Sequence, residues 1–330
     1  MTTFGDLVYQ LGGQPVGAGF IPSTGLTASG GSRAIFVHGS LGTAGGQGSY
    51  KDPVKTLTQA YALMTDGSGD TAYILNDGST SATVRDVALV WAKDNCHIVG
   101  LCAPAINNRA RISTVSGSTD VDAYTPYLTM SASGCIVSNV SWFQGNSENG
   151  KASVGHLVSG SRNFFNRVSV ITGAHANQGD EASYNVQVTG GENIYQDSYI
   201  GQDTAARGGA VSANVRFGAG SLEEAARNVF KNCIFPMWAD DTDPFFILAP
   251  STADVQRWNL FDGCSFINTG TGTLAGGVSW AADAGGYCFL KDSSFYGCTD
   301  VTAATNSLVL ASGNVIGTTT DALLYGAITV

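Results

Sequence analysis

Three carboxylates stand close together at Asp240, Asp241 and Asp243, in the densest acidic stretch of the chain. Carboxylate oxygens are the ligands that Ca²⁺ prefers in proteins, and glycoside hydrolysis uses two carboxylates that lie roughly 5–10 Å apart. The stretch lacks the glycine and the distal glutamate of an EF-hand loop. We therefore take these aspartates as candidates for a carbohydrate or calcium site, with a solvated acidic loop as the alternative.

No other part of the sequence shows a catalytic set. The four histidines have no metal-ligand spacing, no GxSxG motif is present, and the glycine-rich run from Gly42 to Gly48 lacks the GK[ST] of a phosphate loop. We therefore expect no catalytic residues, no metal, no cofactor and no enzymatic activity. Four tryptophans are predicted to pack inward, with stacking on sugars as the alternative: Trp142, Trp238, Trp258 and Trp280.

The seven cysteines are odd in number and include no CxxC pair, which argues against zinc and thioredoxin-type sites. Buried, reduced thiols are the favoured interpretation, and a disulfide framework is the alternative. His97 alternates with apolar residues inside an expected strand and is predicted to be a structural surface residue.

Composition favours short strands joined by turns. Charged residues make up only 13 % of the chain, about half the usual share, and there are 43 glycines.

The formal net charge of −10, with 16 basic residues scattered among 26 acidic ones, argues against nucleic acid as a partner. No stretch reaches the roughly 18 apolar residues that span a bilayer, and the N-terminus does not have the pattern of a secretory signal.

An eight-residue pattern recurs along the chain. It begins with Asn or Cys and continues with two apolar residues, a polar residue, a turn-former, a small residue, any residue and an apolar residue. Its first positions are residues 96, 135, 163, 193, 228, 259 and 288, at intervals of 28 to 39 residues. A period in this range is typical of a solenoid, and two short strands around a tight bend fit stacked coils of parallel strands. The sequence therefore predicts an all-β right-handed parallel β-helix.

Stacking makes specific predictions about equivalent positions. Asn163, Asn193, Asn228 and Asn259 are expected to form a ladder in which each side-chain amide bonds its neighbour. Cys233 and Cys264 are expected to stack as small inward residues. A column of phenylalanine rings is expected at Phe235, Phe266 and Phe295.

The elements before the repeats divide the chain into three regions. Residues 1–31 are predicted to be an extended arm that binds a partner through Leu7, Val8, Tyr9 and Leu11. Residues 32–92 hold strands at 34–37, 72–75 and 87–91 and one capping helix at 53–64, with Asp52 as its N-cap and Pro53 as its first residue. Residues 93–330 form the β-helix, with an apolar tail at 323–330 that packs on the last coil or on a partner.

The ordered series of the strand at 34–37, the glycine-rich loop, Lys55-Thr56-Leu57, Gly69 to Leu75 and Lys93 to Leu101 resembles the N-terminal part of pectate-lyase-like β-helix proteins, especially those of tailed bacteriophages. The loop after the first strand, His38 to Gly42, departs from the Asp- and Asn-rich pattern of that group. The resemblance covers roughly residues 34–300.

This resemblance implies two classes of function. The first is a non-enzymatic virion structural protein, a capsid decoration or head-associated protein assembled in the host cytoplasm and attached through its arm to the major capsid protein or other virion subunits. The second is a tailspike-like protein that binds or depolymerises a surface polysaccharide. A homotrimer is the expected assembly, because closed symmetry is the rule for soluble oligomers.

Overall fold

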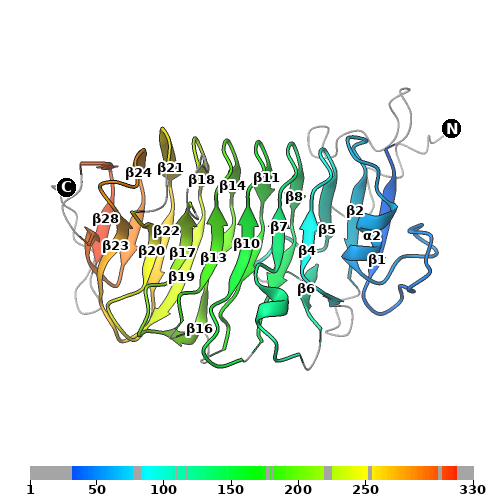
Figure 1. The fold of residues 1–330 in the computed structure, drawn as a ribbon, viewed down its shortest axis with the longest axis horizontal. Coiled ribbons are helices and arrows are strands. Elements are labelled where there is room, and N and C mark those ends of the chain that lie inside the picture. The colour runs from blue at the N-terminus through cyan, green and yellow to red at the C-terminus, as the bar shows by residue number, and fades with distance from the viewer. Residues whose placement is uncertain are drawn as a thin grey trace.

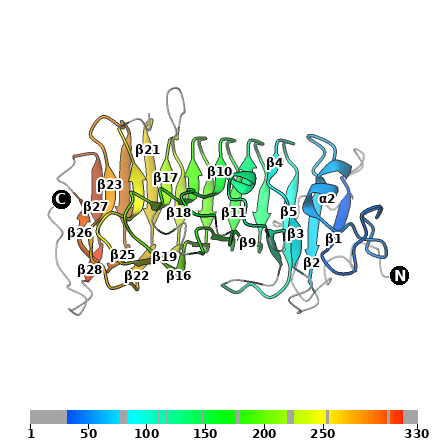
Figure 2. The same ribbon diagram turned by 60° about the horizontal axis from the view of Figure 1, so that its bottom comes forward.

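The computed structural model describes residues 32–317, apart from 77–82, 107, 109, 116–117, 147, 176–178, 180, 219–224, 252–254 and 304–306. The described residues form stacked coils whose strands build three long parallel sheets (Figure 1). The strands succeed one another from the N-terminal to the C-terminal end of the solenoid (Figure 2). Each strand pairs with the equivalent strand of the coil before and the coil after, so the predicted parallel β-helix is confirmed.

The first sheet holds the first strand of each repeat, in the order β1 (Ala34–His38), β2 (Thr71–Leu75), β5 (His97–Leu101), β8 (Ile136–Ser138), β11 (Phe164–Asn166), β14 (Ile194–Gln196), β18 (Val229–Lys231), β21 (Trp258–Asp262), β24 (Tyr287–Lys291) and β27 (Val309–Ser312).

The second sheet follows the tight bend and contains β3 (Val84–Asp86), β6 (Arg111–Thr114), β9 (Ser141–Phe143), β12 (Ser169–Ile171), β15 (Tyr199–Ile200), β19 (Ile234–Ala239), β22 (Ser265–Asn268), β25 (Ser294–Tyr296) and β28 (Val315–Gly317), with β16 (Gln202–Arg207) paired to β19. The third sheet contains β4 (Leu89–Trp91), β7 (Leu128–Met130), β10 (Val154–Val158), β13 (Tyr184–Val188), β17 (Ala213–Phe217), β20 (Phe245–Ala249), β23 (Leu274–Trp280) and β26 (Cys298–Thr302). A 3-10 turn, η3 (Asp122–Tyr124), precedes β7.

The bend between the first and second sheets depends on one residue in the left-handed region of backbone space. In successive coils this position has a φ between 48° and 68° and is held by Asn139, Arg167, Asp197, Asn232, Gly263, Asp292 and Gly313. Asn, Asp and Gly tolerate this conformation best. This requirement explains the turn-forming residue that recurs in the sequence pattern.

The asparagine ladder is confirmed, although most of its bonds run to the backbone. The Oδ1 atoms of Asn163, Asn193, Asn228 and Asn259 each accept the N–H of the equivalent residue one coil earlier, at 2.9 to 3.0 Å. Each Nδ2 donates to a backbone carbonyl in the preceding turn. Because all four side chains are buried, these bonds satisfy groups that water cannot reach.

Aromatic columns fill the interior. Phe235, Phe266 and Phe295 stack as predicted, with centroids 4.7 and 4.4 Å apart. A second column under the first sheet stacks Phe165, Tyr195, Phe230 and Phe261 at 4.2 to 5.1 Å. Cys233 and Cys264 are both buried beside these columns. The seven cysteines form no disulfide with one another, and six of them are buried while Cys102 is half-buried, so the predicted burial holds for six.

The capping helix is shorter than predicted. Helix α2 (Leu57–Leu63) begins after Thr56, which accepts the Gln59 N–H while the Gln59 side chain returns a bond to the Thr56 N–H. Asp52 is therefore not the N-cap, and Pro53 precedes the helix. Val54 instead bridges to Val37 of β1, because its N–H donates to the Phe36 carbonyl. Helix α2 contacts β1, β2 and β3, which places it at the N-terminal end of the solenoid (Figure 1).

Two predicted regions lie outside the described residues, namely the arm at 1–31 with Leu7, Val8, Tyr9 and Leu11, and the apolar tail at 323–330. In the described part of the chain no helix is long and apolar enough to cross a membrane.

Candidate functional site

The outer face of the first sheet carries an apolar row that crosses seven coils. The strands pair in register, so equivalent outward side chains stand side by side: Ile136, Phe164, Ile194, Val229, Leu260, Phe289 and Leu310. Each of these residues is at least partly exposed, whereas the residue after it in the six strands from β8 to β24 is buried. The solenoid therefore presents a continuous apolar ridge to its surroundings.

The ridge becomes aromatic near the C-terminal end. Trp258 of β21 pairs directly with Tyr287 of β24, and the two side chains are 37 % and 46 % exposed. The Tyr287 and Phe289 rings lie 6.3 Å apart. We call Trp258, Leu260, Tyr287, Phe289 and Leu310 the aromatic platform.

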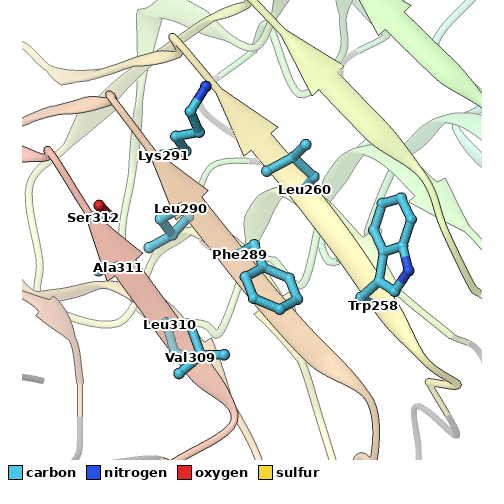
Figure 3. A pocket seen from close by; sticks show the side chains of 9 residues that line it. All are labelled: Trp258, Leu260, Phe289, Leu290, Lys291, Val309, Leu310, Ala311 and Ser312. Carbon is cyan, nitrogen blue, oxygen red and sulfur yellow. The ribbon is translucent and has the colours of Figure 1, made fainter.

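An open groove of about 660 Å³ runs along this platform. Figure 3 shows that its side chains come from three neighbouring strands, with Trp258 and Phe289 on one side and Lys291 and Ser312 at the polar edge. Apolar area with a few polar groups at one edge is the usual character of a ligand site. Exposed neighbouring aromatic rings also mark a surface that binds another molecule.

Charged residues border the apolar ridge on both sides. Lys291 Nζ lies 3.1 Å from Asp262 Oδ1 at one edge, and this pairing raises the pKa of Lys291. On the other side, the turn that leads into each strand places Arg162, Glu192, Arg227 and Arg257 in left-handed backbone positions. Glu192 pairs with Arg162 and Arg227, which lowers the pKa of Glu192. Arg257 precedes Trp258 and is exposed.

A smaller cleft of about 190 Å³ lies on the second sheet, lined by Arg167, Ser169, Asp197 and Tyr199 beneath the segment 104–106. Burial, followed by the charge of nearby Asp203, raises the pKa of Tyr199 to about 12. The cleft therefore combines a guanidinium, a carboxylate and a phenol that stays protonated at neutral pH.

The acidic candidates lie on a different face from the platform. Asp240, Asp241 and Asp243 occupy the exposed turn between β19 and β20. Asp241 Oδ1 accepts the Thr242 N–H, and Asp240 lies against Gly208. Among the described residues no three His, Cys, Asp or Glu side chains gather as a metal site. The calcium hypothesis therefore has no convergent donor set there, and the carbohydrate hypothesis for these residues remains a prediction.

The tryptophans divide into two classes. Trp142 and Trp280 pack inward as predicted, with 2 % and 5 % exposure. Trp238 and Trp258 are 39 % and 37 % exposed, so inward packing is wrong for these two. The sequence does contain a signal that could have separated them: Trp258 stands one residue before the ladder position Asn259, and alternation along a strand therefore turns it outward.

His97 is also placed differently from the prediction. It is 3 % exposed, and its Nδ1 accepts the Ile136 N–H at 3.0 Å. Burial lowers the pKa of His97 to about 4. It is thus a buried structural residue rather than a surface residue.

No family model matches the chain, and no curated protein matches it by sequence. The fold does match solved structures. Pectin methylesterase PemA from Erwinia chrysanthemi is 13 % identical with a TM-score of 0.55, and the match covers 86 % of this chain and 91 % of that one. Pectate lyase Pel9A is 13 % identical with a TM-score of 0.53, over 87 % of this chain and 70 % of that one. The chain thus has the pectate-lyase-like right-handed parallel β-helix fold.

The expectation of a non-enzymatic protein is overturned by these neighbours, because this fold is shared with enzymes that are named for their action on pectin and pectate. At 13 % identity the likeness establishes the fold. A phage protein, Geobacillus virus E2 ORF18, also matches, with 13 % identity and a TM-score of 0.46 over 75 % of this chain and 46 % of that one. That score is too low to support the phage type.

Proposed function

We propose that this protein binds an extended polysaccharide along the outer face of its first sheet, with the aromatic platform as the main contact. The observation that carries the proposal is the pair Trp258 and Tyr287, two large aromatic side chains held in register and exposed on adjacent strands. By contrast, the aromatic side chains on the inner face of this sheet stack on one another in the interior. Aromatic faces left in water at adjacent positions favour stacking on the C–H faces of sugar rings.

The dimensions of the platform suit a linear glycan. Neighbouring strands lie about 4.8 Å apart, so β21, β24 and β27 together span about 10 Å, a length that suits two consecutive sugar rings of an extended chain. Lys291 and Ser312 stand at one edge of the groove, where they can donate hydrogen bonds to hydroxyl or carboxylate groups. The ridge continues from Leu260 toward Ile136, which offers further contacts to a longer chain.

Enzymes with this fold act on pectic polysaccharides, which supports a glycan as the ligand and makes cleavage part of the proposal. The first residues to test for cleavage are Asp240, Asp241 and Asp243, and the second are Asp197 and Asp203 beside Tyr199. Neither group lies on the platform, so cleavage by either would act on a part of the glycan that is not held there. Incubation with each bound polysaccharide, followed by measurement of new reducing ends or of 4,5-unsaturated products, detects hydrolysis or elimination. Alanine at all three acidic-loop positions should abolish cleavage if that loop holds the reaction.

The location of the protein in a virion is a proposal that rests on the sequence resemblance. Within it we favour a tailspike-like position over a head decoration, because a glycan-binding platform has a use where a particle meets a cell surface. The number of copies per purified particle, counted against the major shell protein, tests this. A handful of copies per particle supports the tail position, and hundreds of copies support the head decoration instead.

The direct test of glycan binding is a panel of immobilised polysaccharides that includes neutral and uronate-containing chains. We expect at least one linear polysaccharide to bind the wild-type protein and to quench its tryptophan fluorescence. Binding should be strongly weakened in W258A and kept in W238A, a control in which a tryptophan of similar exposure is removed from the second sheet. Equal binding by both variants would contradict the platform as the site.

A further inference from the structure

The loop between β9 and β10 contains Asn149 followed by Gly150, the only Asn–Gly step in the sequence. Both residues are exposed and lie in a turn. Gly150 has a φ of 70°, a conformation that glycine adopts without strain. A Cβ built on Gly150 would meet no atom within 4 Å apart from its chain neighbours. The step is therefore open to solvent and unhindered by the rest of the solenoid.

Two groups of this step are free to react with each other. In the described part of the chain, neither the Asn149 side chain nor the Gly150 N–H has a hydrogen-bond partner. The main-chain nitrogen of the following residue can attack an asparagine carboxamide carbon, because the two atoms close a five-membered ring. Glycine favours this attack, since it has no Cβ to block the approach and restricts the backbone least.

The fold treats two related steps differently. In Asp262–Gly263 the glycine N–H donates to the Lys291 carbonyl, and in Asp66–Gly67 the glycine N–H donates to the Asp94 carbonyl, both at 2.9 Å. These bonds join neighbouring coils, so each nitrogen is bound to the next coil until the structure opens locally. The Gly150 nitrogen has no such restraint from the described residues.

We propose that Asn149 is a site of spontaneous deamidation through a succinimide. The Gly150 nitrogen forms a bond to Asn149 Cγ, the bond from Cγ to Nδ2 breaks, and the proton of the attacking nitrogen leaves with Nδ2 as ammonia. Water then adds across one of the two ring bonds to that nitrogen. Opening at Cγ gives aspartate, and opening at the main-chain carbonyl carbon gives isoaspartate, in which the chain continues through the side chain. Water is the only co-reactant, and nothing is oxidised or reduced.

The residues on either side of this step tie the loop to segment 120–122. Glu148 Oε2 accepts the Val121 N–H at 2.9 Å, and Lys151 pairs with Asp122. Isoaspartate adds one atom to the main chain between these two ties, and both products add a negative charge between two residues that already contact this acidic segment. We therefore expect the modified loop to bind segment 120–122 less tightly. The aromatic platform lies on the first sheet, so the modification is independent of the proposed glycan binding.

The first test follows the full chain at mildly alkaline pH and physiological temperature, both as native protein and unfolded in urea. Digestion and mass spectrometry give the deamidated fraction at Asn149 over time. We expect the native and unfolded rates to agree within about fivefold, because the reaction needs no local opening of the fold. A larger slowing in the native protein would show that the fold protects Asn149, and would overturn the proposal.

D262N supplies the matched control, because it places a second Asn–Gly step where the glycine N–H is bonded to the Lys291 carbonyl. In urea the two steps should react at similar rates. In the native chain the step at 262 should react at least about tenfold more slowly than Asn149. Equal native rates would show that the free Gly150 nitrogen confers nothing, and would overturn the structural assignment. D66N gives the same comparison if D262N does not fold.

The products identify the route. An isoaspartyl methyltransferase should label the peptide that contains residue 149 in the aged wild-type chain and not in N149Q, because glutamine closes the larger ring far more slowly. Deamidation that gives aspartate without isoaspartate would show direct hydrolysis by water, and would overturn the cyclic route.

Discussion

Asn228 donates both its backbone N–H and its side-chain N–H to one atom, Asn259 Oδ1, at 3.0 and 2.9 Å. Both residues are fully buried. One carbonyl oxygen thus satisfies two donors of the neighbouring coil, and this arrangement ties the register of β21 to that of β18.

We expect N259A to destabilise the protein by about 2–5 kcal/mol. The substitution leaves the two Asn228 donors and the Ala225 carbonyl without their partner, and an unsatisfied buried polar group costs about 1–3 kcal/mol. Urea unfolding followed by circular dichroism measures the change. N149A is the control, because Asn149 is exposed in a loop and its replacement should change stability by less than about 0.5 kcal/mol. Similar losses for the two variants would contradict the ladder as a stabilising element.

His156 makes the protein sensitive to acid. It is fully buried against the edge of Trp142, at a ring distance of 4.8 Å, and neither ring nitrogen has a partner among the described residues. Burial lowers the pKa of His156 to about 3, against an ordinary value of about 6.5. Between these two pKa values the unfolded chain binds the proton and the folded chain does not. The contribution of His156 to the free energy of unfolding is therefore complete above pH 6.5 and is lost as the pH is lowered.

His156 should lower the free energy of unfolding by about 1.4 kcal/mol for each pH unit below 6. His97, whose pKa is about 4, should add a similar loss between pH 6 and pH 4. Urea unfolding at a series of pH values measures the slope. H156M should reduce the slope by the contribution of one histidine. H175M is the matched control, because His175 is exposed and its replacement removes no buried imidazole. A slope that H156M does not alter would show that the folded and unfolded chains bind the proton at His156 equally, and would contradict the lowered pKa.

Loss of the Trp258 ring should weaken glycan binding by about 30-fold. This estimate takes about 2 kcal/mol for an aromatic residue at the centre of a binding surface and a factor of ten for each 1.4 kcal/mol. W258F, which keeps an aromatic face, should lose much less than W258A. Isothermal titration with oligosaccharides of the bound polymer gives the affinities. If W258F and W258A lose affinity equally, the indole N–H rather than the ring face makes the contact.

The thiols should differ sharply in reactivity. Burial raises the pKa of Cys96 to about 11 and of Cys135 and Cys298 to about 12, and only the thiolate reacts with alkylating agents. Cys102 is half-buried, while the other six cysteines are buried. Iodoacetamide at neutral pH should therefore modify Cys102 first in the native protein, as mass spectrometry of the digest would show. Fast labelling of Cys233 or Cys264 in the native state would contradict the packed interior.

The repeat itself determined the fold. The pattern that starts at Asn163, Asn193, Asn228 and Asn259 predicted two short strands around a bend, the ladder and the phenylalanine column, because stacked coils impose the same local environment on equivalent positions. The burial of Cys233 and Cys264 followed from the same pattern. These features depend on residues close together in sequence and on one period, so the sequence alone contains them.

The helix start and the candidate site depended on tertiary structure. Asp52 and Pro53 have the residue types of a helix start, but Val54 pairs with β1, and this long-range backbone pairing delays the helix to Leu57. The acidic stretch at 240–243 is conspicuous in the sequence, yet its three carboxylates do not converge. The aromatic platform joins Trp258, Phe289 and Leu310, which are up to 52 residues apart, and only the register between β21, β24 and β27 brings them into one groove. Which outward residues become neighbours is decided by the stacking of whole coils, and the local sequence does not specify it.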